Sequence, residues 1–248
     1  MDGNYTLIKE RVLRQVYRSF YVGLEVDYQR LDQVTFNQSR PEEPIELPAG
    51  GNGSANLGLG LGLVYDNRHN VLNVRKGLFS ELAFLRYDEA WGSDFSFTSV
   101  ISDNRLFRPL NKRDVLATQL YGQFTVAGQP PFNQLALMGG ESLMRGYYYG
   151  RYRDRNLVAG QVEYRMLPFP FARRWGAAAF IGAGQVFGPD SSFDFSKFLP
   201  AGGLGVRFLL SRVKIFGPGL MWPLRKKGRG TIFLLERHFD NFIEQPNE

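Results

Sequence analysis

The residue types that usually carry enzyme chemistry are scarce in this sequence. It has no cysteine, and its two histidines are His69 and His238, so thiolate zinc sites are excluded and a histidine metal cluster is not expected. Gly182-Ala183-Gly184 is similar to part of a dinucleotide-binding loop, but the third glycine and a following helix are missing, and there is no Walker A sequence. Glu163 and the scattered carboxylates do not by themselves support a hydrolase. We therefore expect neither catalysis nor a cofactor nor a bound metal.

One segment combines residue types that a solvated loop does not need. Residues 138–156 read MGGESLMRGYYYGRYRDRN. Apolar residues such as Leu143 and Met144 precede the arginines, which predicts a loop that folds back and packs against the rest of the protein. Gly139 and Gly140 permit close approach of the backbone. Arg145 is then expected inside the structure, where it needs an acceptor such as a carboxylate.

The composition favours many short strands that would hold this loop. The chain has 248 residues, of which 44% are hydrophobic, 15% are aromatic and 28 are glycine, typical of strands joined by turns. No apolar run is long enough for a transmembrane helix, and the first twelve residues lack the apolar core of a signal peptide. We expect a cytosolic chain or one that lacks its natural front end. Half of the net charge of +6 comes from residues 212–248, so we expect no nucleic-acid partner.

The clearest strand signal is the run LGLGLGL at residues 57–63. With a period of two, all its leucines lie on one face of a strand and all its glycines on the other. A soluble sandwich would turn the leucines toward its core, whereas a membrane barrel would turn them toward lipid and keep the small residues inside.

Alternation of this kind recurs along the chain and predicts about eight strands of about ten residues, the length that a tilted membrane strand needs. The expected strands cover residues 20–28, 57–63, 77–87, 95–105, 115–126, 157–165, 175–187 and 202–210. The connections at 37–55 and 129–156 are long, whereas 111–114 is short, which is the pattern of an outer-membrane barrel. The predicted fold class is all-β, an antiparallel transmembrane β-barrel, here a partial one.

The chain resembles the C-terminal part of the BamA/TamA superfamily, which contains bacterial surface antigens, outer-membrane protein insertases and two-partner secretion transporters. The family's hallmark is an aliphatic-Arg-Gly-aromatic motif in a long loop folded into the barrel lumen, and Met144-Arg145-Gly146-Tyr147 matches it after Gly139-Gly140. Glu163-Tyr164-Arg165 matches a motif of the next strand and is implied to anchor the loop. Asp66-Asn67-Arg68 and Gly77 resemble the family's Asp-x-Arg…Pro-x-x-Gly turn, with Val74 where proline is usual; taken alone, they would make a polar hairpin turn.

Two departures from the family's pattern matter. Gly182 stands where the family usually has an aspartate that contacts the loop arginine, so Arg145 is expected to depend on Glu163 alone. Residues 212–248 lack the two closing strands and the terminal phenylalanine. Permitted codons from Lys214, read in a shifted register, encode such strands, and we hypothesise a frameshift there. We expect a fragment: residues 1–211 as the C-terminal half of a barrel, with the lumenal loop at 129–156, and 212–248 as an aberrant tail.

The resemblance implies an outer-membrane barrel of the protein assembly and translocation family in a Gram-negative bacterium, assisting insertion or translocation of outer-membrane proteins. Its expected partners are outer-membrane lipids, client outer-membrane proteins or a secreted passenger, and periplasmic or lipoprotein accessory subunits. Two alternatives stay open. One is a secretion pore or the barrel anchor of a passenger domain, and the other is a soluble β-sandwich binding module.

Overall fold

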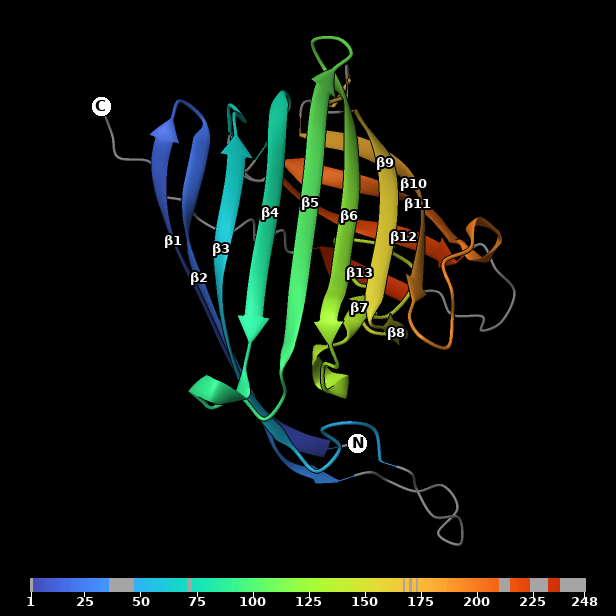
Figure 1. Ribbon diagram of the computed structural model, residues 1–248. Coiled ribbons are helices and arrows are strands. Elements are labelled where there is room, and N and C mark those ends of the chain that lie inside the picture. Colours follow the sequence, from blue (N-terminus) through green and yellow to red (C-terminus); the bar gives the residue numbers. More distant parts are fainter. Residues whose placement is uncertain are drawn as a thin grey trace, which may run out of the picture.

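The computed structural model describes residues 2–35, 47–70, 73–166, 168–169, 171–172, 174–209, 215–223 and 232–236, the last two segments as backbone only. One antiparallel sheet of 11 strands dominates the molecule, with the order β1-β2-β3-β4-β5-β6-β9-β10-β11-β12-β13. It curves into a barrel-like wall (Figure 1). Within the described residues, no helix has the length and hydrophobicity needed to cross a bilayer.

The strands of this sheet are β1 (Asp2–Tyr17), β2 (Phe20–Thr35), β3 (Ser54–Asp66), β4 (Gly77–Tyr87), β5 (Phe97–Pro109), β6 (Asp114–Gly128), β9 (Asn156–Met166), β10 (Trp175–Phe187), β11 (Leu199–Leu209), β12 (Ile215–Pro223) and β13 (Ile232–Glu236). A separate two-stranded sheet pairs β7 (Ala136–Met138) with β8 (Tyr152–Asp154). Three short 3-10 helices complete the elements: η1 (Glu89–Trp91), η2 (Phe132–Gln134) and η3 (Phe195–Lys197).

All eight strands expected from the sequence are present, as β2 to β6 and β9 to β11. The sheet also contains β1, which alternation did not reveal because Glu10 and Arg14 interrupt the apolar positions on its outer side. β12 and β13 lie within the segment expected to be an aberrant tail. Lys214, the site of the hypothesised frameshift, lies outside the described residues, so that hypothesis stays untested.

The two ends of the sheet differ in their connections. The longest connections, β2–β3 and β6–β9, lie at one end of the sheet with β4–β5 and β10–β11, whereas the other end has the tight turns β1–β2 and β5–β6 and a ten-residue connection from β3 to β4. The segments that follow β4 and β6 lie at the lower end of the sheet in Figure 1. This asymmetry, expected from the sequence, is the arrangement of an outer-membrane barrel, in which the short turns face the periplasm.

The Leu/Gly strand decides which face of the sheet is which. Leu59, Leu61 and Leu63 on β3 are 41%, 55% and 37% exposed. The intervening glycines face inward, where the ring of Tyr87 lies 2.6 Å from the position that a Cβ of Gly58 would occupy. Leucines on the outside and small residues inside are the membrane-barrel arrangement, so the soluble β-sandwich alternative is wrong.

Charged side chains collect on the inner face of the first strands. Arg11 of β1 lies 3.4 Å from Glu25 and 2.8 Å from Glu81. Tyr87 donates a hydrogen bond of 3.0 Å to Asp27. The carboxylates of Glu25 and Asp27, which alternation places on one face, are buried. The concave side of the wall is therefore polar and internally paired, opposite in character to the outer side.

Candidate functional site

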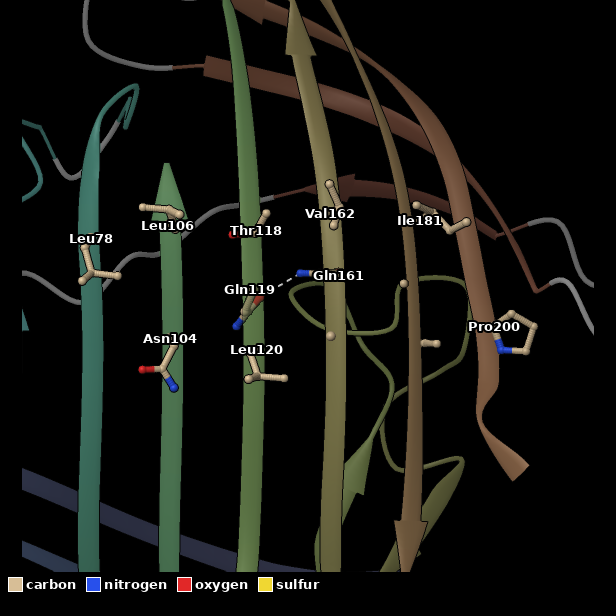
Figure 2. A pocket seen from close by; sticks show the side chains of 13 residues that line it. Leu78, Asn104, Leu106, Thr118, Gln119, Leu120, Gln161, Val162, Ile181 and Pro200 are labelled. Carbon is tan, nitrogen blue, oxygen red and sulfur yellow. Dashed lines mark hydrogen bonds between the residues drawn. The ribbon is translucent and has the colours of Figure 1, made fainter. Parts of the chain in front are cut away.

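The loop between β6 and β9 folds back against the inner face of the sheet. Its short strands β7 and β8 pair at the base of the loop, and its trace passes behind β9 and β10 when the sheet is seen from outside (Figure 2). The loop and the wall share one apolar cluster, whose buried members are Ala136, Met138, Leu143, Met144, Tyr147, Leu157, Ala159, Leu199 and Ala201. The loop at 129–156 is therefore packed on the inside of the wall, as the apolar residues before its arginines predict.

Glycines allow this close packing at two kinds of position. Gly139 and Gly140 have φ of +115° and +114°, and Gly146 has +105°, a region that side chains with a Cβ rarely adopt. Gly184 on β10 faces the loop, and a Cβ there would lie 3.0 Å from the sulfur of Met138. The glycines thus serve both the turns of the loop and its approach to the wall.

Arg145 joins the loop to the wall through buried contacts. It is 6% exposed, and its Nη2 lies 2.5 Å from Oε2 of Glu163, which is 5% exposed. Its guanidinium carbon also lies 3.7 Å from the ring centroid of Phe180 on β10. A charge-assisted hydrogen bond and stacking on an aromatic ring both favour arginine over lysine at this position. The expectation that Arg145 depends on Glu163 alone is too narrow, because Phe180 supplies a second contact.

Glu163 is shared among three arginines. Besides Arg145, its Oε1 accepts from Arg165 Nε at 2.8 Å and from Arg207 Nη2 at 2.5 Å. Arg165 is the next inward residue on β9, and Arg207 lies on β11. The buried carboxylate is therefore surrounded by cations from three different elements, which offsets the cost of removing it from water.

Two further contacts fix the loop, and neither pairing was predicted from the sequence. Gln161 of β9 donates from Nε2 to the backbone oxygen of Ser142 at 2.7 Å, and the Tyr147 hydroxyl donates to the backbone oxygen of Pro200 at 2.8 Å. Gln161 lies opposite Gly182, the position where the resemblance leads us to expect an aspartate. Gln161 could have been found from alternation, since it lies two residues before Glu163 on the same face.

One residue of the predicted anchor lies on the wrong side of the sheet. Tyr164 is 37% exposed on the outer face, and its hydroxyl donates to Asp114 at 2.8 Å. It cannot contact the loop, because neighbours on a strand point to opposite faces. Its prediction as a loop-anchoring partner is therefore wrong, whereas Arg165 faces inward and contacts Glu163 rather than the loop itself.

The aromatic and arginine residues after the motif pack on one another. The guanidinium carbon of Arg151 lies 5.9 Å from the ring centroid of Tyr147 and 5.6 Å from those of Tyr148 and Tyr152. Tyr147 and Tyr152 meet edge to face at 5.5 Å. Such cation–π and aromatic contacts hold a loop that contains little regular structure.

The predicted turn motif forms a compact unit between β3 and β4. Asp66 accepts from Arg68 Nε at 2.9 Å and from Nη2 at 2.8 Å, and the Arg68 guanidinium carbon lies 4.6 Å from the ring centroid of Phe79. Gly77 has φ of +127°, and a Cβ there would lie 2.7 Å from the Arg68 backbone. Val74, at the usual proline position, packs in a buried cluster with Phe107, Val115 and Ala117.

The contacts at this site hold the loop in place. Its ionisable groups are paired with one another, and within the described residues no group of three or more His, Asp or Glu side chains is arranged to hold a metal ion. The paired charges fix a loop to the inside of a polar wall whose outer side is apolar.

Comparisons with known proteins agree with this geometry. A family model described as the Omp85 superfamily domain matches residues 4–214. The fold is similar to the crystal structure of BamA from Haemophilus ducreyi lacking POTRA domains 1-3, with a TM-score of 0.62 and 18% sequence identity. The alignment covers 87% of this chain and 49% of that one, so this chain spans about half the length of that crystallised chain. No curated protein matches the sequence.

Proposed function

This chain belongs to the Omp85 superfamily, and from that premise we propose that it is the loop-bearing wall of an outer-membrane barrel that assists insertion or translocation of outer-membrane proteins. The family membership and the BamA-like fold confirm the resemblance drawn from the sequence. The proposed setting is the outer membrane of a Gram-negative bacterium. The proposed partners are its lipids, client outer-membrane proteins or a secreted passenger, and periplasmic or lipoprotein accessory subunits.

One observation carries the proposal: the loop with the Met-Arg-Gly-Tyr sequence is fixed inside the wall by Arg145 and Glu163. This contact joins the loop to β9, and Arg207 extends the same cluster to β11. With the contact to Phe180 on β10, the loop thereby connects three adjacent strands of the wall. A braced wall keeps its curvature while strands elsewhere in the sheet exchange partners.

The proposed action is physical and involves no catalysed bond change. A strand edge offers a row of backbone donors and acceptors, onto which a client strand can add by β-augmentation. In the whole barrel, the proposed edge is the seam between the first and last strands.

The proposal can be tested with the full chain folded into vesicles of phosphatidylethanolamine and phosphatidylglycerol. Circular dichroism first verifies the sheet. An unfolded outer-membrane β-barrel client is then added, and its folding is followed by its mobility shift on gels. We expect faster client folding than in empty vesicles and a smaller gain with Arg145→Ala. Equal client folding rates in vesicles with and without the chain would overturn the proposal.

The polar inner face supports a second candidate, a secretion pore or the barrel anchor of a passenger domain. Charged residues such as Arg11, Glu25 and Glu81 face the lumen, as in channels that conduct through a polar interior. Planar-bilayer conductance separates the two functions. Stable open-channel currents without any effect on client folding would favour the pore.

A further inference from the structure

A groove of about 510 Å³ lies on the outer face of the sheet, over the middle of the wall from β4 to β11. Figure 2 shows it from outside, with the side chains of its 13 lining residues. Its walls include Leu106, Leu120, Val162 and Ile181, which are 48%, 57%, 41% and 63% exposed. These are side chains of the lipid-facing side, not of the polar lumen.

Strand register explains why the outer face is hollow here. Gly160 of β9 lies opposite Leu120 on one side and Ala183 on the other, and Ala183 lies opposite Pro200. Two of the smallest residues are therefore adjacent in one row, while the next row contains Val162 beside Ile181. The groove is the space that larger side chains at positions 160 and 183 would fill.

The lining chemistry suits hydrocarbon. None of the 13 lining residues, all in the described part of the chain, is charged. The amide of Asn104 at the groove is paired with neighbours on the same outer face, where it accepts from Ser80 Oγ at 2.6 Å and donates to Ser102 Oγ at 2.9 Å. A polar group whose hydrogen bonds are satisfied by neighbouring side chains does not need a headgroup as partner.

The β10–β11 connection lies just beyond the groove on the side of the long loops. Gln185, two residues beyond Ala183 on the same face, donates to the Ser192 backbone oxygen at 3.4 Å and accepts from the Asp194 backbone nitrogen at 3.2 Å. The connection therefore folds over the outer face at this point. It lies at the end of the groove nearest the long loops, and from there the groove runs across the apolar outer face.

We propose that this groove seats one acyl chain of a membrane phospholipid, lying against the backbone at Gly160 and Ala183. The outer face of the wall contacts hydrocarbon in a bilayer, and an empty groove would lose the dispersion contacts of its lining. A single flexible acyl chain can fill a depression formed by two small residues. The inference rests on the sheet lying in a bilayer and does not depend on the insertion activity proposed above.

Gly160→Leu is the informative substitution. A Cβ at position 160 would meet only ordinary contacts, 3.7 Å to the Gln119 backbone oxygen and 3.8 Å to Leu120 Cδ1, so the new side chain fits the fold and fills the groove. Ala179→Leu is a matched control, since it also adds bulk on the outer face of β10, opposite Tyr164 and outside the groove. Ala183→Ile provides a second groove-filling variant if Gly160→Leu does not fold.

The experiment places the full chain in vesicles of phosphatidylethanolamine and phosphatidylglycerol with a small fraction of phosphatidylethanolamine carrying a diazirine in one acyl chain. After irradiation, mass spectrometry maps lipid adducts along the sequence. We expect adducts concentrated on β6, β9 and β10 in the wild type and Ala179→Leu, and a several-fold loss there in the groove-filling variant. Two results would overturn the proposal: adduct yields that depend only on the exposure of outer-face residues, or the same adduct pattern in wild type and Gly160→Leu.

Discussion

Removing Arg145 should release the lumenal loop, but removing Glu163 should release it more. Arg145→Ala deletes a hydrogen bond to a charged group, worth about 1.5–3 kcal/mol, and a cation–π contact worth about 0.5–2 kcal/mol. Glu163 keeps Arg165 and Arg207 as partners, so no buried charge is left unpaired. We expect the loop to lose about 2–5 kcal/mol of docking free energy.

Glu163→Gln is the harsher change because it removes the shared anion. Three guanidinium groups would then surround a neutral amide, and breaking a buried pair in this way costs about 3–5 kcal/mol or more. The two substitutions therefore have a predicted order, with Glu163→Gln more damaging than Arg145→Ala.

A cysteine reporter can measure loop release, since the chain contains no cysteine. Leu143→Cys places a thiol in the buried loop cluster, where a water-soluble maleimide reacts only when the loop opens. For Arg145→Ala, a loss of about 2–5 kcal/mol corresponds to labelling about 30-fold to about 5000-fold faster. Ser142→Cys, next to it but exposed, should label at one rate in every background.

Two results would refute this reasoning. Unchanged Leu143→Cys labelling in the Arg145→Ala background would show that Arg145 does not hold the loop. Faster labelling with Arg145→Ala than with Glu163→Gln would show that the shared carboxylate is not the centre of the contact.

Three other substitutions test other parts of the structure. Gly139→Ala should speed Leu143→Cys labelling more than tenfold, because φ is +115° and the new Cβ would collide with the backbone oxygen of Tyr148. Asp66→Asn should lower the free energy of unfolding by about 1–3 kcal/mol in urea titrations from vesicles, since it breaks the two-point contact with Arg68. Leu61→Arg should cost about 2–4 kcal/mol in the same titration, because it places a charge on the lipid-facing side.

Matched controls separate the causes. Gly92→Ala has a similar φ of +94° but nothing within 4 Å of the new Cβ, so it should show backbone strain without collision. Gln123→Arg places the same guanidinium on the inner face of β6 and should cost less than Leu61→Arg. An equal loss at both positions would contradict the assignment of the two faces.

Much of this fold could be predicted from the sequence because alternation is a local property. In the run from Leu57 to Leu63, leucine and glycine alternate, so the sequence alone assigns each residue to one of the two faces. The structure adds that the leucines face outward. The apolar and glycine residues around Arg145 likewise predicted a packed loop. The same rule, applied strictly, would have removed Tyr164 from the predicted anchor, since it alternates with Glu163.

What the sequence by itself determined is which residues share a face of each strand and where the chain folds back. Only the tertiary structure decided which residues of different strands meet: Arg207 with Glu163, Tyr147 with Pro200, and Gly160 beside Ala183. The physical reason is register. A strand's side-chain period is fixed by its own backbone geometry, whereas the offset between paired strands depends on turns and packing across the whole sheet.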